Sequence, residues 1–241
     1  MISRNDNHAG FIDIHSHFLY GIDDGAASKE IMENMLDAAW TDGVREMIAT
    51  PHIMPGLQQM RLDLIQERMN EARHYCLQKK YNILLNSGAE ILFSPMMELF
   101  IQEHPLPTLS ESSYILLEFL PNVSYETIAS AIEMLSRSGY QVILAHVERY
   151  GALFHRNNAY RLKDRYGIAY QLNCSTVIDG VGLWRNRKVR RWLQEGMIDR
   201  IASDCHDDRI RQIRMNEAYE KMCCCYGNVL ADKMMKNRVL P

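Results

Sequence analysis

Residues Phe11-Ile12-Asp13-Ile14-His15-Ser16-His17 form an apolar run that ends in two imidazole side chains. Similar short β-rich runs recur along the chain, and segments with helical spacing separate them. The predicted strands are Phe11–His15, Glu46–Thr50, Asn82–Asn86, Tyr114–Phe119, Gln141–Ala145, Ala169–Asn173 and Arg200–Ser203. Because strands that alternate with helices form parallel units with right-handed crossovers, the sequence predicts an α/β fold.

Apolar stripes at helical spacing lie between these strands. Ser28 is a predicted N-cap and Gly43 a predicted stop for the first helix. Further stripes run from Leu62 to Cys76, from Ile128 to Leu135 and from Val189 to Leu193, and a last helix is expected from about Ile210 towards Cys224.

The strands themselves are almost continuously apolar, as in Ile115-Leu116-Leu117, which is typical of strands covered on both faces. A closed or nearly closed barrel explains this pattern best. A doubly wound open sheet is the alternative, but no glycine-rich phosphate loop follows the first strand.

Composition and charge exclude several classes of protein. The chain has 241 residues, of which 47% are apolar, and its formal net charge is -3, which does not indicate a nucleic-acid binder. There is no apolar run of about 18 residues and no secretory signal, so we expect no membrane insertion. Residues 1–10 are predicted to be an extension ahead of a single catalytic domain, residues 11–241.

The six cysteines form no CxxC pair and have no regular spacing, and three are consecutive at Cys223, Cys224 and Cys225. This favours reduced thiols in a cytoplasmic protein over a disulfide framework or a thiolate zinc site.

Side chains that can bind metals follow the predicted strands at their carboxyl ends. They are His15, His17, His52, Glu90, Glu118, His146, Asp204 and His206. The loops at that end of an α/β barrel form the active-site face, so we expect these side chains to converge. A His-x-His pair alone is more often ordinary hydrogen-bonded histidine. Together with the carboxylates, however, it offers nitrogen and oxygen ligands suited to zinc, manganese or iron, and Glu90 could bridge two ions.

For two acidic positions near the first strand, the sequence allows both a structural and a functional interpretation. Asp23-Asp24-Gly25 is either a tight acidic turn or a loop that brings Asp24 to the metal ligands. Asp13 could orient a ligand imidazole or be a polar strand residue.

Arginines distinguish between classes of metal hydrolase. Arg149 follows His146, and Arg209 and Arg211 follow His206. Planar guanidinium groups match phosphate oxygens, which favours a phosphorylated substrate, although salt bridges with Glu148 or Asp207 are the structural alternative. A further basic run is either a solvated helix face or a surface for an acidic phosphopeptide, and it comprises Arg185, Arg187, Lys188, Arg190 and Arg191.

Taken together, the motifs resemble the polymerase-and-histidinol-phosphatase (PHP) superfamily. They are Asp13-Ile14-His15-Ser16-His17, Gly21-Ile22-Asp23-Asp24-Gly25, Ala49-Thr50-Pro51-His52, Gly88-Ala89-Glu90, Leu117-Glu118, His146-Val147-Glu148-Arg149-Tyr150 and Ser203-Asp204-x-His206. The Gly-Ile-Asp-Asp-Gly and His-Val-Glu-Arg-Tyr segments are similar to those of bacterial manganese-dependent protein-tyrosine phosphatases of capsule and exopolysaccharide loci. Phe18-Leu19-Tyr20 departs from that branch, which usually has a small apolar pair and a proline there.

The resemblance implies a distorted seven-stranded (β/α) TIM-like barrel of the PHP type with three divalent ions, expected to be manganese, with iron or zinc as alternatives. The implied ligand sets are His15, His17, Glu90 and Asp204 for one ion, His52, Glu118 and the shared Glu90 for a second, and Asp24, His146 and His206 for a third. Arg149 and Arg211, the latter preferred to Arg209, would bind phosphate. Asp24 or His206 could assist catalysis if not fully engaged by metal.

The implied reaction is removal of phosphate from phosphotyrosine by direct attack of water, without a phosphoenzyme. The implied substrate is the C-terminal tail of a bacterial tyrosine kinase that controls capsule or exopolysaccharide synthesis. A small-molecule phosphatase of the histidinol-phosphate kind and a non-catalytic metal-binding regulatory module are the alternatives. The first needs a lidded pocket for which 241 residues leave little room, and the second would usually have lost ligands.

Overall fold

The computed structural model describes residues 10–57 and 61–237, so the predicted extension at residues 1–10 lies, apart from Gly10, outside the described residues. The strands in these ranges are β1 (Phe11–Ser16), β2 (Val44–Ala49), β3 (His52–Ile53), β4 (Leu84–Ser87), β5 (Glu90–Leu92), β6 (Tyr114–Glu118), β7 (Gln141–Leu144), β8 (Ala169–Asn173) and β9 (Arg200–Ala202). All seven predicted strands are present, and β3 and β5 are additional.

Among the described residues, helices occupy the five intervals that the apolar stripes predicted, and four further helices are present. In chain order the helices are α1 (Lys29–Asp42), α2 (Leu62–Lys79), α3 (Met97–Glu103), α4 (Tyr125–Arg137), α5 (Asn158–Tyr166), α6 (Cys174–Asp179), α7 (Leu183–Gln194), α8 (Met215–Tyr226) and α9 (Asn228–Met235). Three short 3-10 turns accompany them, η1 (Leu109–Glu111), η2 (Val147–Arg149) and η3 (Gly151–Phe154). The predicted caps of the first helix are confirmed, since Ser28 Oγ accepts the Ile31 N–H and Gly43 adopts a left-handed φ of 93°.

The strands form a distorted parallel barrel. One sheet has the order β1-β2-β4 and the other β3-β5-β6-β7-β8-β9, and an isolated parallel bridge between Ser16 and Cys205 joins the chain after β9 to β1. Along the chain, β3 follows β2 after Thr50-Pro51, and β5 follows β4 after Gly88-Ala89. If β2 with β3, and β4 with β5, are each counted as one interrupted barrel strand, the barrel has seven strands. The predicted seven-stranded barrel is therefore confirmed.

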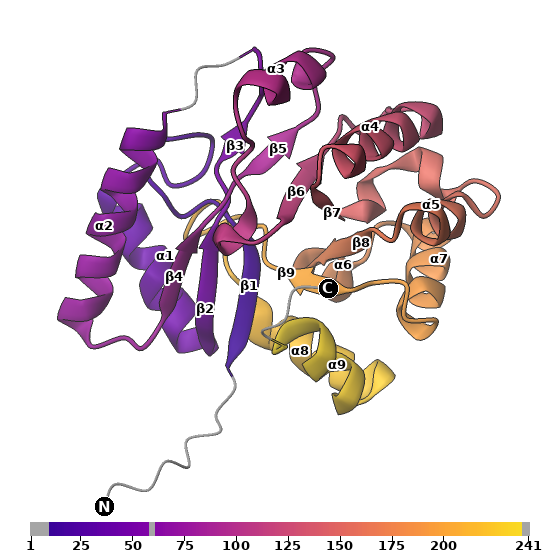
Figure 1. Ribbon diagram of the computed structural model, residues 1–241. Helices are drawn as coiled ribbons and strands as arrows, with labels where there is room; N and C mark the ends of the chain where they lie inside the picture. The colour runs from indigo at the N-terminus through magenta and orange to yellow at the C-terminus, as the bar shows by residue number, and fades with distance from the viewer. Residues whose placement is uncertain (1–9, 58–60, 238–241) are drawn as a thin grey trace, which may run out of the picture.

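Helices cover the outside of the barrel, and apolar side chains fill its interior. Figure 1 shows α1 and α2 outside the sheet of β1, β2 and β4, whereas α4, α5 and α7 lie outside the later strands and α8 and α9 lie below β1 and β9. Alternate strand residues point to opposite faces. One buried cluster therefore lies against the helices, and a second, smaller cluster includes Ile12, Ile14, Ile48, Leu116, Ile143, Ala145, Ala169 and Ala202.

The predicted start of the last helix at about Ile210 is wrong, because α8 begins at Met215. The carboxylate of Asp207 accepts the backbone N–H groups of Arg209, Ile210 and Arg211 at 2.6, 2.5 and 3.1 Å. An aspartate that binds the backbone just after itself stabilises a turn in competition with a helix. The residues after His206 consequently form a loop at the barrel mouth.

No helix in the part of the chain that the structure describes is long and apolar enough to cross a membrane.

Candidate metal centre

The imidazoles and carboxylates that follow the strands converge at one end of the barrel. The Nε2 atoms of His15 and His17 lie 3.2 Å apart, and Glu90 Oε2 lies 3.0 and 3.3 Å from them. Asp204 Oδ1 lies 3.4 Å from His15 Nε2. All four side chains are buried, and their ligand atoms lie within 4.8 Å of one another. This group coincides with the first ligand set that the resemblance implies.

Two further groups with metal-ligand spacing adjoin the first. His52, Glu90 and Glu118 form one of them, with His52 Nδ1 3.2 Å from Glu90 Oε2. The other consists of His17, Asp24, His52 and His206. In this group Asp24 Oδ1 lies 3.4 Å from His52 Nε2 and 3.5 Å from His206 Nε2.

His146 lies elsewhere than the implied third set would place it. Its Nε2 is 2.8 Å from Glu90 Oε1 and 3.3 Å from Glu118 Oε1, so it belongs beside the second group. His52, which turns Nε2 towards Asp24, is the imidazole that joins Asp24 and His206. His52 also stays with Glu90 and Glu118, as the implied second set has it, so the geometry places His146 beside the second set and leaves Asp24 and His206 next to His52 and His17.

The side chains present fit divalent ions. Glu90 Oε2 and His206 Nε2 are buried and have no hydrogen bond among the described residues, and such unsatisfied buried atoms are rare in native proteins. The donor set contains only imidazole nitrogens and carboxylate oxygens, which suits manganese, zinc or iron. Cations held by the groups to which these two atoms belong would satisfy both orphaned positions.

Electrostatics at His17 also favour a bound cation. Burial opposes a positive charge on this ring, yet the hydrogen bonds and negative charges of Asp23 and Glu90 raise its pKa to about 10. The surrounding carboxylates thus stabilise positive charge at the centre of the site, whether it is carried by a proton or by a metal ion.

Asp23, which the sequence left unassigned, orients two of the candidate ligands. Its Oδ2 accepts from His17 Nδ1 at 2.8 Å and from the His52 backbone N–H at 2.9 Å, while Oδ1 accepts the Gly25 N–H at 2.9 Å. Burial works against its ionisation, but the bond from His17 lowers the pKa of Asp23 to about 2. An ionised carboxylate on Nδ1 leaves Nε2 of His17 available to a metal.

A buried amide chain lies under the site, and the sequence indicated only one of its two members, Asn173, as a weaker ligand at the end of its strand. Gln171 Oε1 accepts the His146 backbone N–H at 2.7 Å and lies 3.2 Å from His15 Nδ1. Its Nε2 donates to Asn173 Oδ1, and Asn173 Nδ2 donates to Asp204 Oδ2 at 2.6 Å. The only signal in the sequence is a pair of amides at alternate positions of an otherwise apolar strand.

The two arginines favoured by the sequence reach the same carboxylate. Arg149 Nη2 lies 2.5 Å from Asp204 Oδ2, and Arg211 Nη2 lies 3.0 Å from Asp204 Oδ1. Arg209 is 87% exposed and lies 3.8 Å from Asp208, so the geometry separates it from the site. The alternative bridge from Arg149 to Glu148 is not formed, because Glu148 is buried and binds Thr176 Oγ1 instead.

The unusual first loop is anchored outside the site. Phe18 and Leu19 are fully buried, and the Tyr20 hydroxyl donates to Glu71 on α2 at 3.0 Å while Arg68 stacks on the Tyr20 ring. The departure from the branch pattern therefore fixes the loop to α2 and leaves the candidate ligands in place.

Two residues close to the ligands have structural roles. The Asp13 carboxylate accepts the Ser203 N–H at 2.9 Å and its hydroxyl at 2.5 Å, so it ties β1 to the end of β9. The Cys205 thiol is buried in the core, and burial raises its pKa, which excludes it as a nucleophile at neutral pH.

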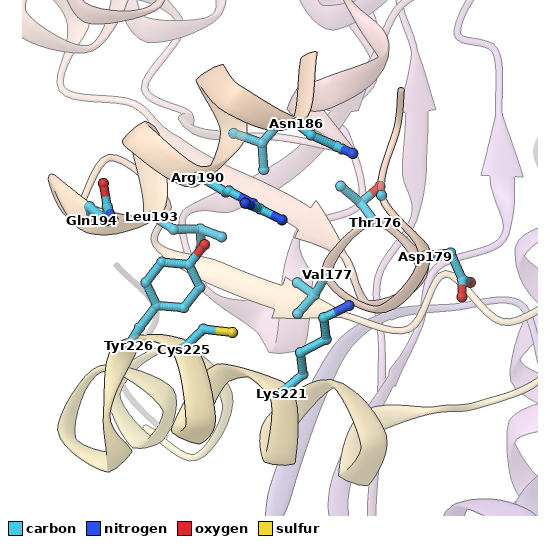
Figure 2. Close-up of a pocket in the computed structure, with 12 residues that line it drawn as sticks. Thr176, Val177, Asp179, Asn186, Arg190, Leu193, Gln194, Lys221, Cys225 and Tyr226 are labelled. Atoms are coloured by element: carbon cyan, nitrogen blue, oxygen red, sulfur yellow. The ribbon is translucent and has the colours of Figure 1, made fainter. Parts of the chain in front are cut away.

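A separate pocket lies between α6, α7 and α8 (Figure 2). It has a volume of about 360 Å³, and the side chains of Thr176, Arg190, Lys221 and Tyr226 line it. None of the candidate ligands is among the described residues that line it, so this pocket is distinct from the barrel mouth.

A parallel α/β barrel that gathers imidazoles and carboxylates at the strand ends is typical of metal-dependent hydrolases. Within that class, the chain belongs to the CpsB/CapC family of capsular polysaccharide synthesis, whose sequence model matches residues 11–239. The family predicted from the motifs is thereby confirmed.

Relatives of this chain are similar to it over most of their length. The tyrosine-protein phosphatase CpsB of Streptococcus pneumoniae is 27% identical over 227 residues, which are 90% of this chain and 91% of the relative. A solved structure from work on YwqE of Bacillus subtilis and CpsB of Streptococcus pneumoniae, described as metal-dependent tyrosine phosphatases, superposes with a TM-score of 0.80 at 25% identity and covers 91% of this chain and 89% of the other. Histidinol phosphate phosphatase of Lactococcus lactis shares the fold, with a TM-score of 0.57 at 15% identity over 92% of this chain and 94% of the other.

Proposed function

We propose that this chain is a metal-dependent protein-tyrosine phosphatase. The observation that carries the proposal is the position of Arg149 and Arg211, whose guanidinium groups meet on Asp204 beside the candidate ligands while 39% of each side chain remains exposed. Guanidinium forks open to solvent at a metal centre suit the oxygens of a phosphomonoester. The near full-length similarity to proteins named tyrosine phosphatases supports the same activity.

The cofactor proposed is three divalent ions, expected to be manganese, with iron or zinc as alternatives. The proposed ligand sets are His15, His17, Glu90 and Asp204 for one ion, His52, Glu90 and Glu118 with His146 beside them for a second, and Asp24 and His206 for a third. Ions held there would lower the pKa of water and stabilise charge on the phosphate oxygens.

The protein's own side chains then position the substrate. Arg149 and Arg211 bind the phosphate oxygens through N–H groups that Asp204 does not occupy, and Asp204 keeps both guanidinium groups turned to the ligands. Asp24 has 63% of its side chain exposed at the mouth, so it is the candidate ligand best placed to exchange a proton with solvent near the leaving oxygen. A phenolate leaves readily, which reduces the need for a strong general acid.

The proposed substrate is phosphotyrosine on the C-terminal tail of a bacterial tyrosine kinase that acts in capsule or exopolysaccharide synthesis. The family to which the chain belongs supports the pathway. We place the reaction in the cytoplasm, because all six cysteines are free thiols and a reducing compartment preserves them. The division into an extension, residues 1–10, and one catalytic domain, residues 11–241, is part of the same proposal.

Metal-dependent turnover tests the proposal directly. Protein stripped with a chelator is reloaded with manganese, zinc or iron and assayed on p-nitrophenyl phosphate, a phosphotyrosine peptide and histidinol phosphate. We expect turnover of the first two substrates only with metal, with Glu90→Gln inactive and Asp37→Asn, on the outer helix α1, fully active. Absence of metal-stimulated turnover on every substrate contradicts an enzyme, and activity on histidinol phosphate alone contradicts the substrate.

A further inference from the structure

Helix α7 begins against the loop that carries Arg149. Arg185 Nη1 lies 3.5 Å from the carbonyl oxygen of Glu148, the residue before Arg149. Lys188 Nζ donates to the carbonyl oxygen of Phe154, at the end of the same loop. The first two turns of α7 therefore pack against the loop that carries the phosphate-binding side chain of Arg149.

This helix carries an excess of positive charge that its surroundings do not neutralise. Residues 183–194 contain five arginines and lysines and no acidic residue. Over the ranges that the structure describes, only Arg191 among the five has a carboxylate within 4.0 Å, namely Glu195 at 2.7 Å. Cations near the N-terminus of a helix are also unfavourable for its dipole. An anionic partner would relieve both effects.

Two large apolar side chains stand beside these cations. Leu183 is 95% exposed, and Trp184 is 55% exposed. The Trp184 ring packs 5.7 Å from the Phe154 ring, and Lys188 Nζ lies 5.1 Å from the Trp184 ring. Packing against Phe154 thus holds Trp184 in place next to the basic side chains. Exposed apolar side chains beside cations suit a peptide better than a free anion.

The opposite edge of α7 is engaged differently. Arg190 points into the pocket between α7 and α8, as Figure 2 shows, and lines it together with Lys221. Arg187 is exposed and does not line that pocket. Four residues of α7 therefore form a basic and apolar surface outside the pocket, namely Leu183, Trp184, Arg187 and Lys188, which we call the α7 platform.

We propose that the α7 platform binds acidic residues that flank the phosphotyrosine of the substrate chain, with Leu183 and Trp184 receiving an apolar side chain of the same segment. The proposal rests on the proposed phosphotyrosine phosphatase activity and specifies the substrate that the same site prefers. The charge of the platform complements an acidic peptide, and the contacts of Lys188 and of the neighbouring Arg185 join α7 to the loop that carries the phosphate-binding arginine. Exposed charges of this kind act mainly on association and partner choice.

The test compares two phosphotyrosine peptides that differ only in flanking aspartates or lysines. At low salt we expect the wild-type kcat/KM to favour the acidic peptide by roughly tenfold, and the preference to shrink at about 0.5 M salt. Arg187→Glu should remove most of that preference, and Trp184→Ala should raise the KM of both peptides. Both variants should leave turnover of p-nitrophenyl phosphate unchanged. Lys233→Glu, the same charge reversal on an exposed lysine of α9, is the matched control and should leave the preference intact.

Direct binding separates the platform from the proposed activity. The probe is the acidic peptide, labelled with a fluorophore and carrying a non-hydrolysable mimic of phosphotyrosine, so that the holoprotein binds it without turnover. Fluorescence anisotropy should show weaker binding of this probe for Arg187→Glu than for Lys233→Glu. Equal binding by these two variants, or no preference between the peptides, overturns the platform even if turnover is normal. Loss of all turnover with the binding difference preserved overturns only the activity. The peptide assignment is overturned if vesicles of anionic lipid displace the peptide from the protein and Arg187→Glu weakens binding to the vesicles more than binding to the peptide.

Discussion

Asp23→Asn isolates the role of a residue that is proposed to orient ligands without binding metal. The carboxylate is only 6% exposed and accepts three hydrogen bonds, from His17 Nδ1 and from the backbone N–H groups of His52 and Gly25. The amide has nearly the same shape, so packing is preserved. It has one accepting oxygen instead of two, however, and carries no charge.

The size of the effect follows from the hydrogen bonds that the amide cannot make. An amide that keeps its oxygen on His17 turns its NH₂ towards the Gly25 N–H, and the bond to the imidazole is no longer charge-assisted. Hydrogen bonds to charged groups contribute roughly 1.5–3 kcal/mol, about twice a neutral bond. Loss of such a partner behind a metal-bound histidine typically lowers metal affinity by about 10- to 100-fold. We expect the manganese concentration for half-maximal activity to rise by that factor.

The assay titrates manganese into chelator-treated protein and follows hydrolysis of p-nitrophenyl phosphate. Asp37→Asn is the control, because Asp37 also accepts a hydrogen bond, from Tyr75 at 2.8 Å, but lies on α1 outside the site. At saturating manganese, Asp23→Asn should recover most of the wild-type kcat. An unchanged manganese requirement would refute the orienting role. A loss of kcat that excess metal does not restore would show that Asp23 acts in turnover itself.

Three further predictions concern phosphate binding, metal removal and pH. Arg149→Lys keeps the charge but loses the planar fork, so kcat/KM on p-nitrophenyl phosphate should fall roughly tenfold, against about a hundredfold for Arg149→Ala; equal activity of Lys and Arg would contradict bidentate binding. Chelation should lower the melting temperature by several degrees, and manganese should restore it in a concentration-dependent way, because a ligand that binds only the folded state stabilises it; an unchanged melting curve would argue against structural ion binding. The bonds from Lys29 and Arg68 lower the pKa of Glu71 to about 2, so their stabilisation is present above pH 4.5 and is lost as the pH falls towards 2. Glu71→Gln should therefore be less stable than wild type by about 1 kcal/mol at pH 7, with urea melts converging near pH 2–3; a constant difference would refute this.

The sequence predicted the strands well because parallel strands buried on both faces are recognisable as apolar runs. It missed β3 and β5, which have only two and three residues and continue β2 and β4 after a break. Pro51 interrupts the first of these walls because it offers no N–H to a ladder. Elements so short carry no periodicity, and only their place beside neighbouring strands makes them strands.

The sequence also located the candidate ligands, because an imidazole or carboxylate directly after a buried strand has no packing role. Their grouping could not be predicted in the same way. Whether His52 or His146 approaches Asp24 depends on the shape of the barrel mouth, which no local pattern encodes. The same holds for Asp23 and Asp24, which are adjacent in the chain although one faces His17 and the other the open mouth.

Backbone strain at the strand ends links the fold to the site. His146 and Asp204 have positive φ angles of 30° and 54°, a region that costs a non-glycine residue about 1–3 kcal/mol. Each strained residue is held by a bond from across the barrel: the His146 N–H binds Gln171 Oε1 at 2.7 Å, and the Asp204 N–H binds the His15 carbonyl at 2.9 Å. The turn directs the His146 side chain towards Glu90 and the Asp204 side chain towards His15, instead of letting each continue along the strand. Gln171 connects the two strained turns, because besides the His146 N–H it contacts His15 and, through Asn173, Asp204. The geometry of the site is therefore determined by a buried amide on β8 as much as by the ligands themselves, and this is why a search for metal-binding residue types finds the ligands without finding what places them.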